Sequence, residues 1–375
     1  MQLKIDKTNW KKVRLGDVAT EYSKRIDNPS KSKFDRFVGS SNIGQWDFRI
    51  QSWDSTDSVT SAMKLFEPND YLLVRRSLYA SDFRERAPRA TFGGVCSGDI
   101  LTIKENPEMV SDGFLIGILN CPSLWKYVVA NASGSITRRI KWKDLANYEF
   151  LLPPKDQQAQ LAELLWAMDE VIEREREVFK QLDYLFKSKA KFISDNHIHT
   201  GEYKKVKEIC LIKDNLRKPI NSSERDSMKG EIPYYGANGL VDYLNHYIFD
   251  EDLVLLAEDG GNFNEFYSKE IAYKISGKSW VNNHAHVLSV ENSSIPIDWI
   301  YYSLVHKNIL KYIIGTTRLK LNKSELENIL IWIPDGSKME KLSMEMKVTE
   351  VVRKQADSKV MNSKALKKSL INQIF

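Results

Sequence analysis

Cysteine is scarce in this sequence, and long apolar runs are absent. The three cysteines, Cys96, Cys121 and Cys210, are widely spaced and form no CxxC pair. This usage argues against a disulfide framework and is typical of a reducing compartment. No apolar stretch approaches the ~18 residues that a membrane-spanning helix needs, and the charged N-terminal residues lack the apolar core of a secretory signal. We therefore expect a cytoplasmic protein without a membrane segment.

The balance of charges is only mildly basic. Lysine and arginine number 55 against 50 for aspartate and glutamate, which gives a net charge of +5 over 375 residues. This small excess permits an acidic partner such as nucleic acid without requiring one, so local clusters have to decide. The length favours two or three domains, and a hydrophobic content of 42% is enough to give them apolar cores.

One stretch of the sequence occurs twice. Residues 134–154 read GSITRRIKWKDLANYEFLLPP, and residues 315–335 read GTTRLKLNKSELENILIWIPD, with glycine, leucine, asparagine and proline at matching positions. Upstream, FEPNDYLLV resembles FDEDLVLLA, and further alternating apolar segments follow in the same order in both halves. A long period repeated twice indicates duplicated domains rather than a solenoid.

The composition of each copy predicts an α+β fold that is rich in short strands. Alternating segments of Val, Ile, Tyr and Phe are interrupted by Gly, Asn, Asp and Pro clusters, which is typical of strands joined by turns. We expect two such domains, over residues 1–153 and 197–334. A charged segment follows the proline at the end of each copy.

These two charged segments, 154–196 and 335–375, predict long helices. Between Asp156 and Ile193 there is no glycine or proline, and apolar residues recur at alternating steps of four and three. That spacing is the seam of a coiled coil, and it is weaker in the second segment. The predicted seam residues are Leu161, Leu165, Met168, Ile172, Phe179, Leu182, Phe186, Leu342, Met346, Val360 and Leu370.

The charges of both predicted helices are polarised along their length. Acidic residues gather toward the start of the first helix, and lysines gather at the ends of both. Antiparallel packing would place the basic end of the second helix beside the acidic start of the first, whereas parallel packing would oppose lysines. We therefore predict an antiparallel coiled coil. The alternative is that each helix separately follows its own macrodipole.

Taken in order, these segments resemble the specificity subunit of type I restriction–modification systems. The resemblance is carried by LPPKDQQAQLAELLWAMDEVIERE at the start of the central helix, by RLGDV near the N-terminus and by IPYYGANG in the second copy. The two Gly-hydroxyl-basic blocks also match. The resemblance covers essentially the whole chain, and the order and duplication of the motifs are more specific than any one of them. The weak seam of the second helix is a departure from the pattern.

The resemblance implies two target-recognition domains joined by two long helices that form an antiparallel coiled coil. Each domain would bind one half of a split sequence in double-stranded DNA. The helices would dock two modification subunits, and restriction subunits would complete the holoenzyme. S-adenosylmethionine, ATP and Mg²⁺ are then expected on the partner subunits, with no cofactor and no catalytic residue in this chain.

The sequence lacks the motifs for the reactions of such a system. Methyl transfer to adenine needs a Gly-rich cofactor loop and an Asn-Pro-Pro-aromatic motif, but Asn28 and Pro29 are followed by Ser30 and Lys31. The two glycine blocks lack the Gly-Lys-Ser/Thr ending of a phosphate-binding loop. We therefore expect neither methyl transfer nor ATP hydrolysis from this chain.

Two other patterns imitate metal sites. Asp335, Glu345 and Lys347 resemble the Asp…Glu-x-Lys cluster of many nucleases, which requires carboxylates that converge on one cation. A capping aspartate on a surface helix is the favoured interpretation. His284 and His286, two residues apart on a predicted strand, face the same side and could share a metal. Because no third ligand is evident, we favour a polar recognition surface and predict no metal site.

The first candidate DNA-binding surface is the arginine-rich segment 75–89, RRSLYASDFRERAPR. Arginine is the commonest partner of guanine edges and of phosphates. The alternative is a solvated loop, which is how most charge runs end. The candidates in this segment are Arg75, Arg76, Tyr79, Arg84, Arg86 and Arg89.

The duplicated Gly-hydroxyl-basic blocks form the second candidate surface. A glycine turn followed by hydroxyls and cations suits phosphate binding through backbone amides and charge. Because both copies have this feature, a shared and sequence-independent role fits best. The candidates are Thr137, Arg138, Arg139 and Lys141 in the first block and Thr317, Arg318 and Lys320 in the second.

Base recognition is expected from stretches that differ between the copies, because the resemblance implies that the reading loops diverge. In the second copy these candidates are Tyr234, Asn238, Lys278, Trp280, Asn282 and Asn283. Asparagine can pair bidentately with adenine, while core packing is an equal alternative for Tyr234. For Glu258 and Asp259, a turn is favoured over contact with cytosine.

Three functions are compatible with the sequence. The favoured one is a DNA-specificity subunit that directs methyltransferase and restriction subunits to a bipartite, asymmetric target. The second is a stand-alone metal-dependent endonuclease that uses Asp335, Glu345 and Lys347. The third is a coiled-coil adaptor that does not bind DNA. Salt-dependent DNA binding separates the first from the third.

Overall fold

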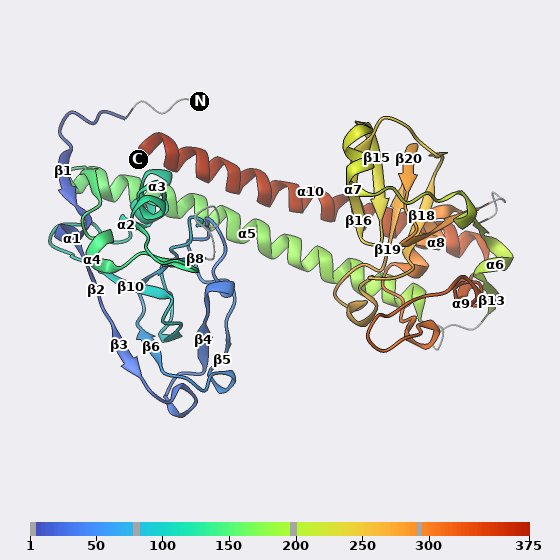
Figure 1. Cartoon of the computed structure of the whole chain (residues 1–375), viewed down its shortest axis with the longest axis horizontal. Helices are drawn as coiled ribbons and strands as arrows, with labels where there is room; N and C mark the ends of the chain where they lie inside the picture. The colour runs from blue at the N-terminus through green and yellow to red at the C-terminus, as the bar shows by residue number, and fades with distance from the viewer. Residues whose placement is uncertain (1–4, 78–82, 196–200, 291–294) are drawn as a thin grey trace. The chain divides into compact units, whose positions relative to one another are not determined.

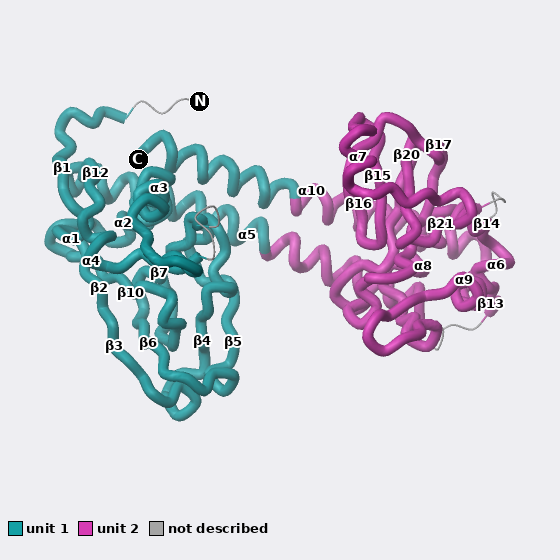
Figure 2. The backbone as a smooth tube through the Cα atoms, in the orientation of Figure 1, with its two compact units in different colours: residues 1–176, 358–375 teal, residues 177–357 magenta. Residues whose placement is uncertain are grey.

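The computed structural model describes residues 5–77, 83–195, 201–290 and 295–375. The chain divides into two compact units (Figure 2): unit 1 comprises residues 1–176 and 358–375, and unit 2 comprises residues 177–357. Each unit contains one strand-rich domain and part of two long helices, α5 (Lys155–Ser194) and α10 (Gly336–Ile374). Within the described residues, no helix is both long enough and apolar enough to cross a membrane.

Unit 1 is built mainly from short strands (Figure 1). Its larger sheets have the strand orders β2–β10–β7 and β3–β6–β9–β4–β5, and two-stranded ladders join β1 to β12 and β8 to β11. The strands are β1 Lys11–Arg14, β2 Ala19–Glu21, β3 Lys24–Ile26, β4 Arg36–Val38, β5 Asp54–Ser55, β6 Met63–Phe66, β7 Tyr71–Val74, β8 Arg76–Ser77, β9 Gly94–Cys96, β10 Ile100–Glu105, β11 Arg138–Arg139 and β12 Glu149–Leu152. The short helices are α1 Leu15–Val18, α2 Leu115–Leu119, α3 Pro122–Asn131 and α4 Trp142–Leu145.

The core of unit 1 explains two of its apolar runs. Strand β7 reads YLLV and is buried at every position, which is why its sequence is continuously apolar instead of alternating. Helix α2 reads LIGIL and is also completely buried, in the same hydrophobic cluster as the C-terminal residues of α10. A side chain at Gly117 would crowd the ring of Phe375 and the side chain of Leu165, so glycine allows α2 to pack closely against both.

Unit 2 has two four-stranded sheets, with the orders β14–β21–β18–β19 and β16–β15–β20–β17, and a ladder of β13 with β22. The strands are β13 Glu202–Lys205, β14 Leu211–Ile212, β15 Lys229–Gly236, β16 Gly239–Leu244, β17 Phe249–Asp250, β18 Leu253–Ala257, β19 Ala272–Ile275, β20 Lys278–Val281, β21 Ala285–Ser289 and β22 Leu330–Ile333. The short helices are α6 Val206–Ile209, α7 Ser222–Ser227, α8 Ile297–Leu304 and α9 Lys323–Leu326.

The repeat in the sequence corresponds to a repeated scaffold. In each unit the first strand pairs antiparallel with the strand that ends the domain, β1 with β12 and β13 with β22. The central three strands also match, because β10 lies between β2 and β7 as β21 lies between β14 and β18. The other large sheet differs between the units, in strand number and in strand order. The shared part of the scaffold thus coincides with the matching sequence blocks.

The long helices run antiparallel within each unit, as the charge pattern predicts. In unit 2, α5 and α10 are joined by the pairs Lys189–Glu345 and Asp183–Arg353, both 3.0 Å, so that residue numbers rise along one helix while they fall along the other. In unit 1, Lys367 of α10 lies 2.8 Å from Asp169 of α5. The predicted α+β fold with an antiparallel helix pair is confirmed.

Every one of the eleven residues of the predicted heptad seam is buried or half-buried. The second helix gave a weaker pattern because some of its seam positions are polar. In unit 1 one of these is Lys367, whose side chain is only 2% exposed.

Lys367 and Asp169 form a buried ion pair in unit 1. The Lys367 ammonium also lies 3.9 Å from the ring centroid of Phe48, and Asp169 accepts a second hydrogen bond, of 2.9 Å, from Arg49. Burial lowers the pKa of Lys367, although the charge of Asp169 opposes the shift. A buried pair of this kind is costly to break but contributes little net stability over apolar residues of the same size.

Replacing one partner of this pair should therefore destabilise unit 1 more than replacing both. We expect Asp169→Leu to lower the free energy of unfolding by roughly 3–5 kcal/mol, because it leaves the Lys367 charge buried and unpaired. The double variant Asp169→Leu/Lys367→Met should recover most of that loss. Urea unfolding followed by circular dichroism measures both.

Lys359→Met is the matched control, since Lys359 is exposed on the same helix and should change the unfolding free energy by no more than ~0.5 kcal/mol. A double variant that is as unstable as Asp169→Leu alone would contradict this account of the pair.

Candidate nucleic-acid interface

The Gly-hydroxyl-basic blocks occupy the same place in both units. Each begins with a glycine in a left-handed conformation, Gly134 with φ +134° and Gly315 with φ +88°. A Cβ at either position would collide with the carbonyl oxygen of the residue three places later, so only glycine fits this turn. The turn brings the basic residues back beside β8 in unit 1 and beside Asp259, just after β18, in unit 2.

Equivalent backbone hydrogen bonds fix both blocks. In unit 1, Ile140 N–H donates to the carbonyl of Arg75 at 3.0 Å; in unit 2, Leu321 N–H donates to the carbonyl of Glu258 at 2.8 Å. The bridge between Arg139 and Arg76 likewise corresponds to the bridge between Lys320 and Asp259. The two positions that face each block therefore carry arginines in unit 1, Arg75 and Arg76, and carboxylates in unit 2, Glu258 and Asp259.

In unit 1, Arg76 and Arg139 share the carboxylate of Asp99. Asp99 accepts from Arg76 at 2.7 Å and from Arg139 at 2.9 Å, so that its two oxygens hold one guanidinium each. Burial alone would raise the pKa of Asp99, but the two guanidinium groups lower it below its usual value. With Arg75 and Arg138 beside this triad, the turn face of unit 1 keeps an excess of positive charge.

The corresponding face of unit 2 is neutralised from within. Asp259 pairs with Arg318 at 2.9 Å and with His284 Nδ1 at 2.7 Å, and Glu258 pairs with Lys320 at 3.1 Å. His284 occupies the position of Asp99 in the strand register, so cation and anion are exchanged between the two units. Two of the cations predicted to bind phosphate in this block are therefore already paired with carboxylates.

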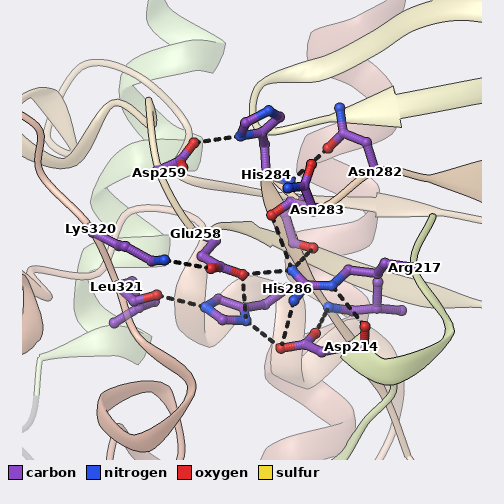
Figure 3. Close-up of polar contacts among 12 residues, drawn as sticks. Asp214, Arg217, Glu258, Asp259, Asn282, Asn283, His284, His286, Lys320 and Leu321 are labelled. Atoms are coloured by element: carbon purple, nitrogen blue, oxygen red, sulfur yellow. Dashed lines mark hydrogen bonds and ion pairs between the residues drawn. The ribbon is translucent and has the colours of Figure 1, made fainter. Parts of the chain in front are cut away.

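A buried histidine lies beneath this face (Figure 3). His286 is 1% exposed; its Nδ1 lies 2.6 Å from Asp214 and its Nε2 lies 2.8 Å from the carbonyl oxygen of Leu321. A carbonyl only accepts, so Nε2 carries a proton. Burial would raise the pKa of Asp214, but the hydrogen bond and charge of His286, with Val287 N–H and Arg217, lower it overall. The two ring nitrogens of His286 are therefore both engaged, Nε2 with the Leu321 carbonyl and Nδ1 with the Asp214 carboxylate.

The same cluster does not fit a metal ion. Asp214, Glu258 and His286 offer three ligand atoms that all lie within 4.8 Å of one another, and the sequence had identified only His286 of these. His284 is not part of this cluster and pairs with Asp259. However, both ring nitrogens of His286 already have hydrogen-bond partners, Asp214 and the Leu321 carbonyl, and Arg217 lies 2.7 Å from Glu258. A metal requires a neutral imidazole and free carboxylate oxygens. The cluster is an ion-pair network that ties β21 to the Leu321 turn.

The candidate residues fall into three groups by exposure. Those with exposed side chains are Arg84, Arg139, Lys141, Asn238, Lys278, Asn283, Thr317 and Arg318. Those that are half-buried are Arg75, Arg76, Arg86, Arg89, Thr137, Arg138 and Lys320. Those that are buried are Tyr234, Trp280 and Asn282. Tyr79 lies outside the described residues.

The buried group has structural partners. The Tyr234 hydroxyl accepts from Ile220 N–H at 3.2 Å, the Trp280 indole donates to Lys218 O at 2.8 Å, and the Asn282 carbonyl accepts from His284 N–H at 2.8 Å. The structure favours packing for all three and corrects the expectation of base contact. It also assigns Arg89 to the fold, because its guanidinium binds Asp112 and lies over the ring of Tyr71.

The nuclease-like residues do not converge. Asp335 caps helix α10, accepting from Lys338 N–H at 3.0 Å and from the Ser337 hydroxyl at 2.7 Å. Glu345 lies ten residues further along the same helix, about 15 Å away along its axis, and pairs with Lys189. Carboxylates at that separation cannot share one cation. Asp335 and Glu345 therefore do not form the metal site that the nuclease hypothesis requires.

Comparison with known proteins agrees with this architecture. The family described as type I restriction modification DNA specificity domain matches residues 199–342. Unit 2 contains a type I DNA specificity domain. Over 133 residues the chain is 41% identical to a putative type I restriction enzyme specificity subunit of Haemophilus influenzae, which is 36% of this chain and 33% of that relative. These matches support the family resemblance over the second half of the chain, and the match spans about a third of the length of that relative.

Solved structures extend the likeness in fold to the whole chain. The type I restriction–modification S subunit of M. genitalium superposes with a TM-score of 0.60 at 16% identity, covering 100% of this chain and 98% of that one. A chain from a study of the assembly and conformational transition of a type I system gives 0.54 at 16% identity, over 98% and 97%. At this low sequence identity the superpositions establish the fold alone. The residues that match the family model lie within unit 2 of that fold.

Several residues that shape the interface were not identified from the sequence as part of it. Asp99, Asp214 and Arg217 belong to no motif, and the pairing roles of Glu258 and Asp259 were overlooked in favour of a turn. A signal was available, because aligning FEPNDYLLV with FDEDLVLLA places Arg75 and Arg76 opposite Glu258 and Asp259. Opposite charges at equivalent positions of a repeat indicate different counterions nearby.

The Asp214–His286 pair should behave as a coupled unit in the specificity domain. The strand register places Leu101 and Ser23 of unit 1 at the positions of His286 and Asp214. We expect His286→Leu to lower the free energy of unfolding by about 2–4 kcal/mol, because Asp214 stays buried without its main partner. Asp214→Ser/His286→Leu, which copies unit 1, should be the more stable of the two. Thermal and urea unfolding compare them, with His284→Leu as a half-exposed control.

The Asp214–His286 pair also makes the stability of the wild type depend on pH in a way that the double variant should not share. A carboxyl whose pKa is depressed on folding contributes stability above its unfolded pKa, about 3.9, and that stability is lost as the pH falls through the folded value. The pKa values of Asp214, Glu258 and Asp259 are all lowered in this way. Acidification below about pH 4 should therefore destabilise the wild type more steeply than the double variant. Equal slopes would contradict the ion-pair account.

Proposed function

We propose that this chain is the DNA-specificity subunit of a type I restriction–modification complex. Each unit would bind one half of a bipartite sequence in double-stranded DNA. The observation that carries the proposal is the specificity domain of unit 2, together with the recurrence of its scaffold and glycine turn in unit 1. Two copies of one recognition scaffold in a single chain suit a target with two half-sites that need not be identical.

Catalysis would reside in the partner subunits. Asp335 and Glu345, the carboxylates of the nuclease-like pattern, do not converge, and the sequence lacks methyltransferase and nucleotide-binding motifs. S-adenosylmethionine, ATP and Mg²⁺ would then be bound by modification and restriction subunits. Such a role on genomic DNA would place the protein in the cytoplasm.

Helix α5 carries a feature that suits partner docking. Its buried seam faces α10, yet a second set of apolar residues is exposed at intervals of seven: Leu164 38%, Val171 51%, Val178 52% and Leu185 46%. A heptad period is the spacing at which a further helix can follow the same face. One of the related structures is described in terms of complex assembly of a type I system. We assign the exposed stripe to helices of two modification subunits.

Salt-dependent DNA binding tests the first part of the proposal. The full chain should select a bipartite sequence from a random duplex pool, and its affinity should fall steeply as salt rises. Lys141→Ala, in the first basic block, should weaken binding to all sequences alike and reduce the salt slope by about 1. Lys359→Ala on α10 is the control. Failure to bind any duplex at low salt would instead support the adaptor hypothesis.

Co-purification tests the second part. The variant Val178→Glu/Leu185→Glu places charges in the exposed stripe, where they do not disturb the buried seam. We expect it to fold and to bind DNA like the wild type but to lose the modification subunit encoded with it. A matched variant, Lys180→Glu/Gln181→Glu, changes exposed polar positions of the same helix and should retain the partner. Retention of the partner by the first variant would refute the docking assignment.

A further inference from the structure

A cavity in unit 1 is lined by arginine. Its volume is about 650 Å³, and its polar lining includes Ser40, Gln45, Arg76, Arg84, Arg86 and Asp99. All of these residues belong to unit 1, and three of them come from the arginine-rich segment. The cavity adjoins the turn at which the basic block meets the strand after β7, since Arg76 belongs to both.

The cavity gathers three arginines, Arg76, Arg84 and Arg86, near the carboxylate of Asp99. Among the described lining residues Asp99 is the one carboxylate, and its two oxygens are taken by Arg76 and Arg139. Arg86 forms no ion pair with any residue that the structure describes. Its Nη1 donates to the Ser40 carbonyl at 3.3 Å, while its Nε is buried without a hydrogen-bond partner among the described residues.

The half-buried position of Arg86 restricts its side chain before any ligand arrives. Burial and the neighbouring charge of Arg84 both lower the pKa of Arg86, which is consistent with cations crowded into a space with too few anions. A planar guanidinium held in this way offers donors in a fixed geometry. Acceptor atoms that lie side by side in a plane complement it best.

We propose that this cavity reads guanine in the half-site bound by unit 1, a proposal that rests on the DNA-binding function above. Guanine presents O6 and N7 as adjacent acceptors in the major groove, and a guanidinium can bind both at once. Arg86 is the principal reader, and Arg84 lines the same space. In unit 2 the strand positions of Arg75 and Arg76 are occupied by Glu258 and Asp259, which are neutralised by Arg217, Lys320, Arg318 and His284.

The inference therefore concerns one half-site only. Unit 2 lacks the surplus of donors at the equivalent place, so the guanine preference created by this cavity should occur in the half of the target that unit 1 contacts. Phosphate contact is the competing use of an arginine. The two uses differ in outcome, because a base contact discriminates between sequences whereas a phosphate contact does not.

Selection from a random duplex pool by the full chain, followed by sequencing, gives the preference at every position. We expect at least one strongly preferred guanine in one half-site. Arg86→Lys keeps the charge but loses the planar guanidinium that can donate to O6 and N7 at once. It should lower the preference for that guanine by about 10-fold with the salt slope unchanged. Arg25→Lys, at an exposed arginine of unit 1, is the matched control and should leave every preference as it is.

The possible failures are distinguishable. If no duplex is selected, the proposed DNA-binding function itself fails and the inference falls with it. If a bipartite target is selected but Arg86→Lys weakens all sequences equally, Arg86 binds phosphate and the inference alone is overturned. A target without guanine in either half-site overturns it as well. Thermal unfolding checks that Arg86→Lys is folded, and Arg84→Lys serves as the second test of the cavity if it is not.

Discussion

The hydrogen bonds that hold each glycine turn against its neighbouring strand are the constraint on which the rest of the interface depends. Ile140 donates to Arg75 in unit 1 and Leu321 donates to Glu258 in unit 2, with nearly the same geometry. These bonds are between backbone atoms, so they position a basic block without specifying the side chains across from it. The scaffold is therefore repeated, while the charges it displays are free to differ. That separation of backbone from side chain is what a recognition domain needs to change its target without changing its fold.

The two units differ strongly in charge at the positions that face their basic blocks, although the backbone hydrogen bonds there are equivalent. Unit 1 opposes its basic block with arginines and supplies the single carboxylate of Asp99, whereas unit 2 opposes it with two carboxylates and buries His286 behind them. One face consequently retains donors for an acceptor-rich partner, and the other satisfies its ion pairs internally. The long helices also carry two separate sets of apolar residues. Their buried seam joins the two helices within each unit, and the outer stripe of α5 remains available for another helix.

Much of the fold could be predicted from the sequence because its signals are periodic. The heptad spacing identified both helices, their polarised charges indicated the antiparallel direction, and the repeated blocks located the shared scaffold. Individual site residues were harder to place, because their burial depends on which strands pair. Tyr234 and Trp280 looked like readers in variable segments, but parallel pairing of β15 with β20 sets them opposite one another within unit 2, where both are buried. The role of Asp99 depends on contacts with Arg76 and Arg139, which lie far away in the sequence and are invisible to local patterns.

The central claim is that two copies of one scaffold each contact one half of a divided DNA site. Hydroxyl-radical footprinting of the full chain on its selected duplex tests it most directly. The account predicts two separate protected patches with accessible backbone between them, and a substitution in the basic block of unit 1, Lys141→Ala, should weaken only one patch. A single continuous patch, or equal weakening of both patches by that substitution, would contradict it.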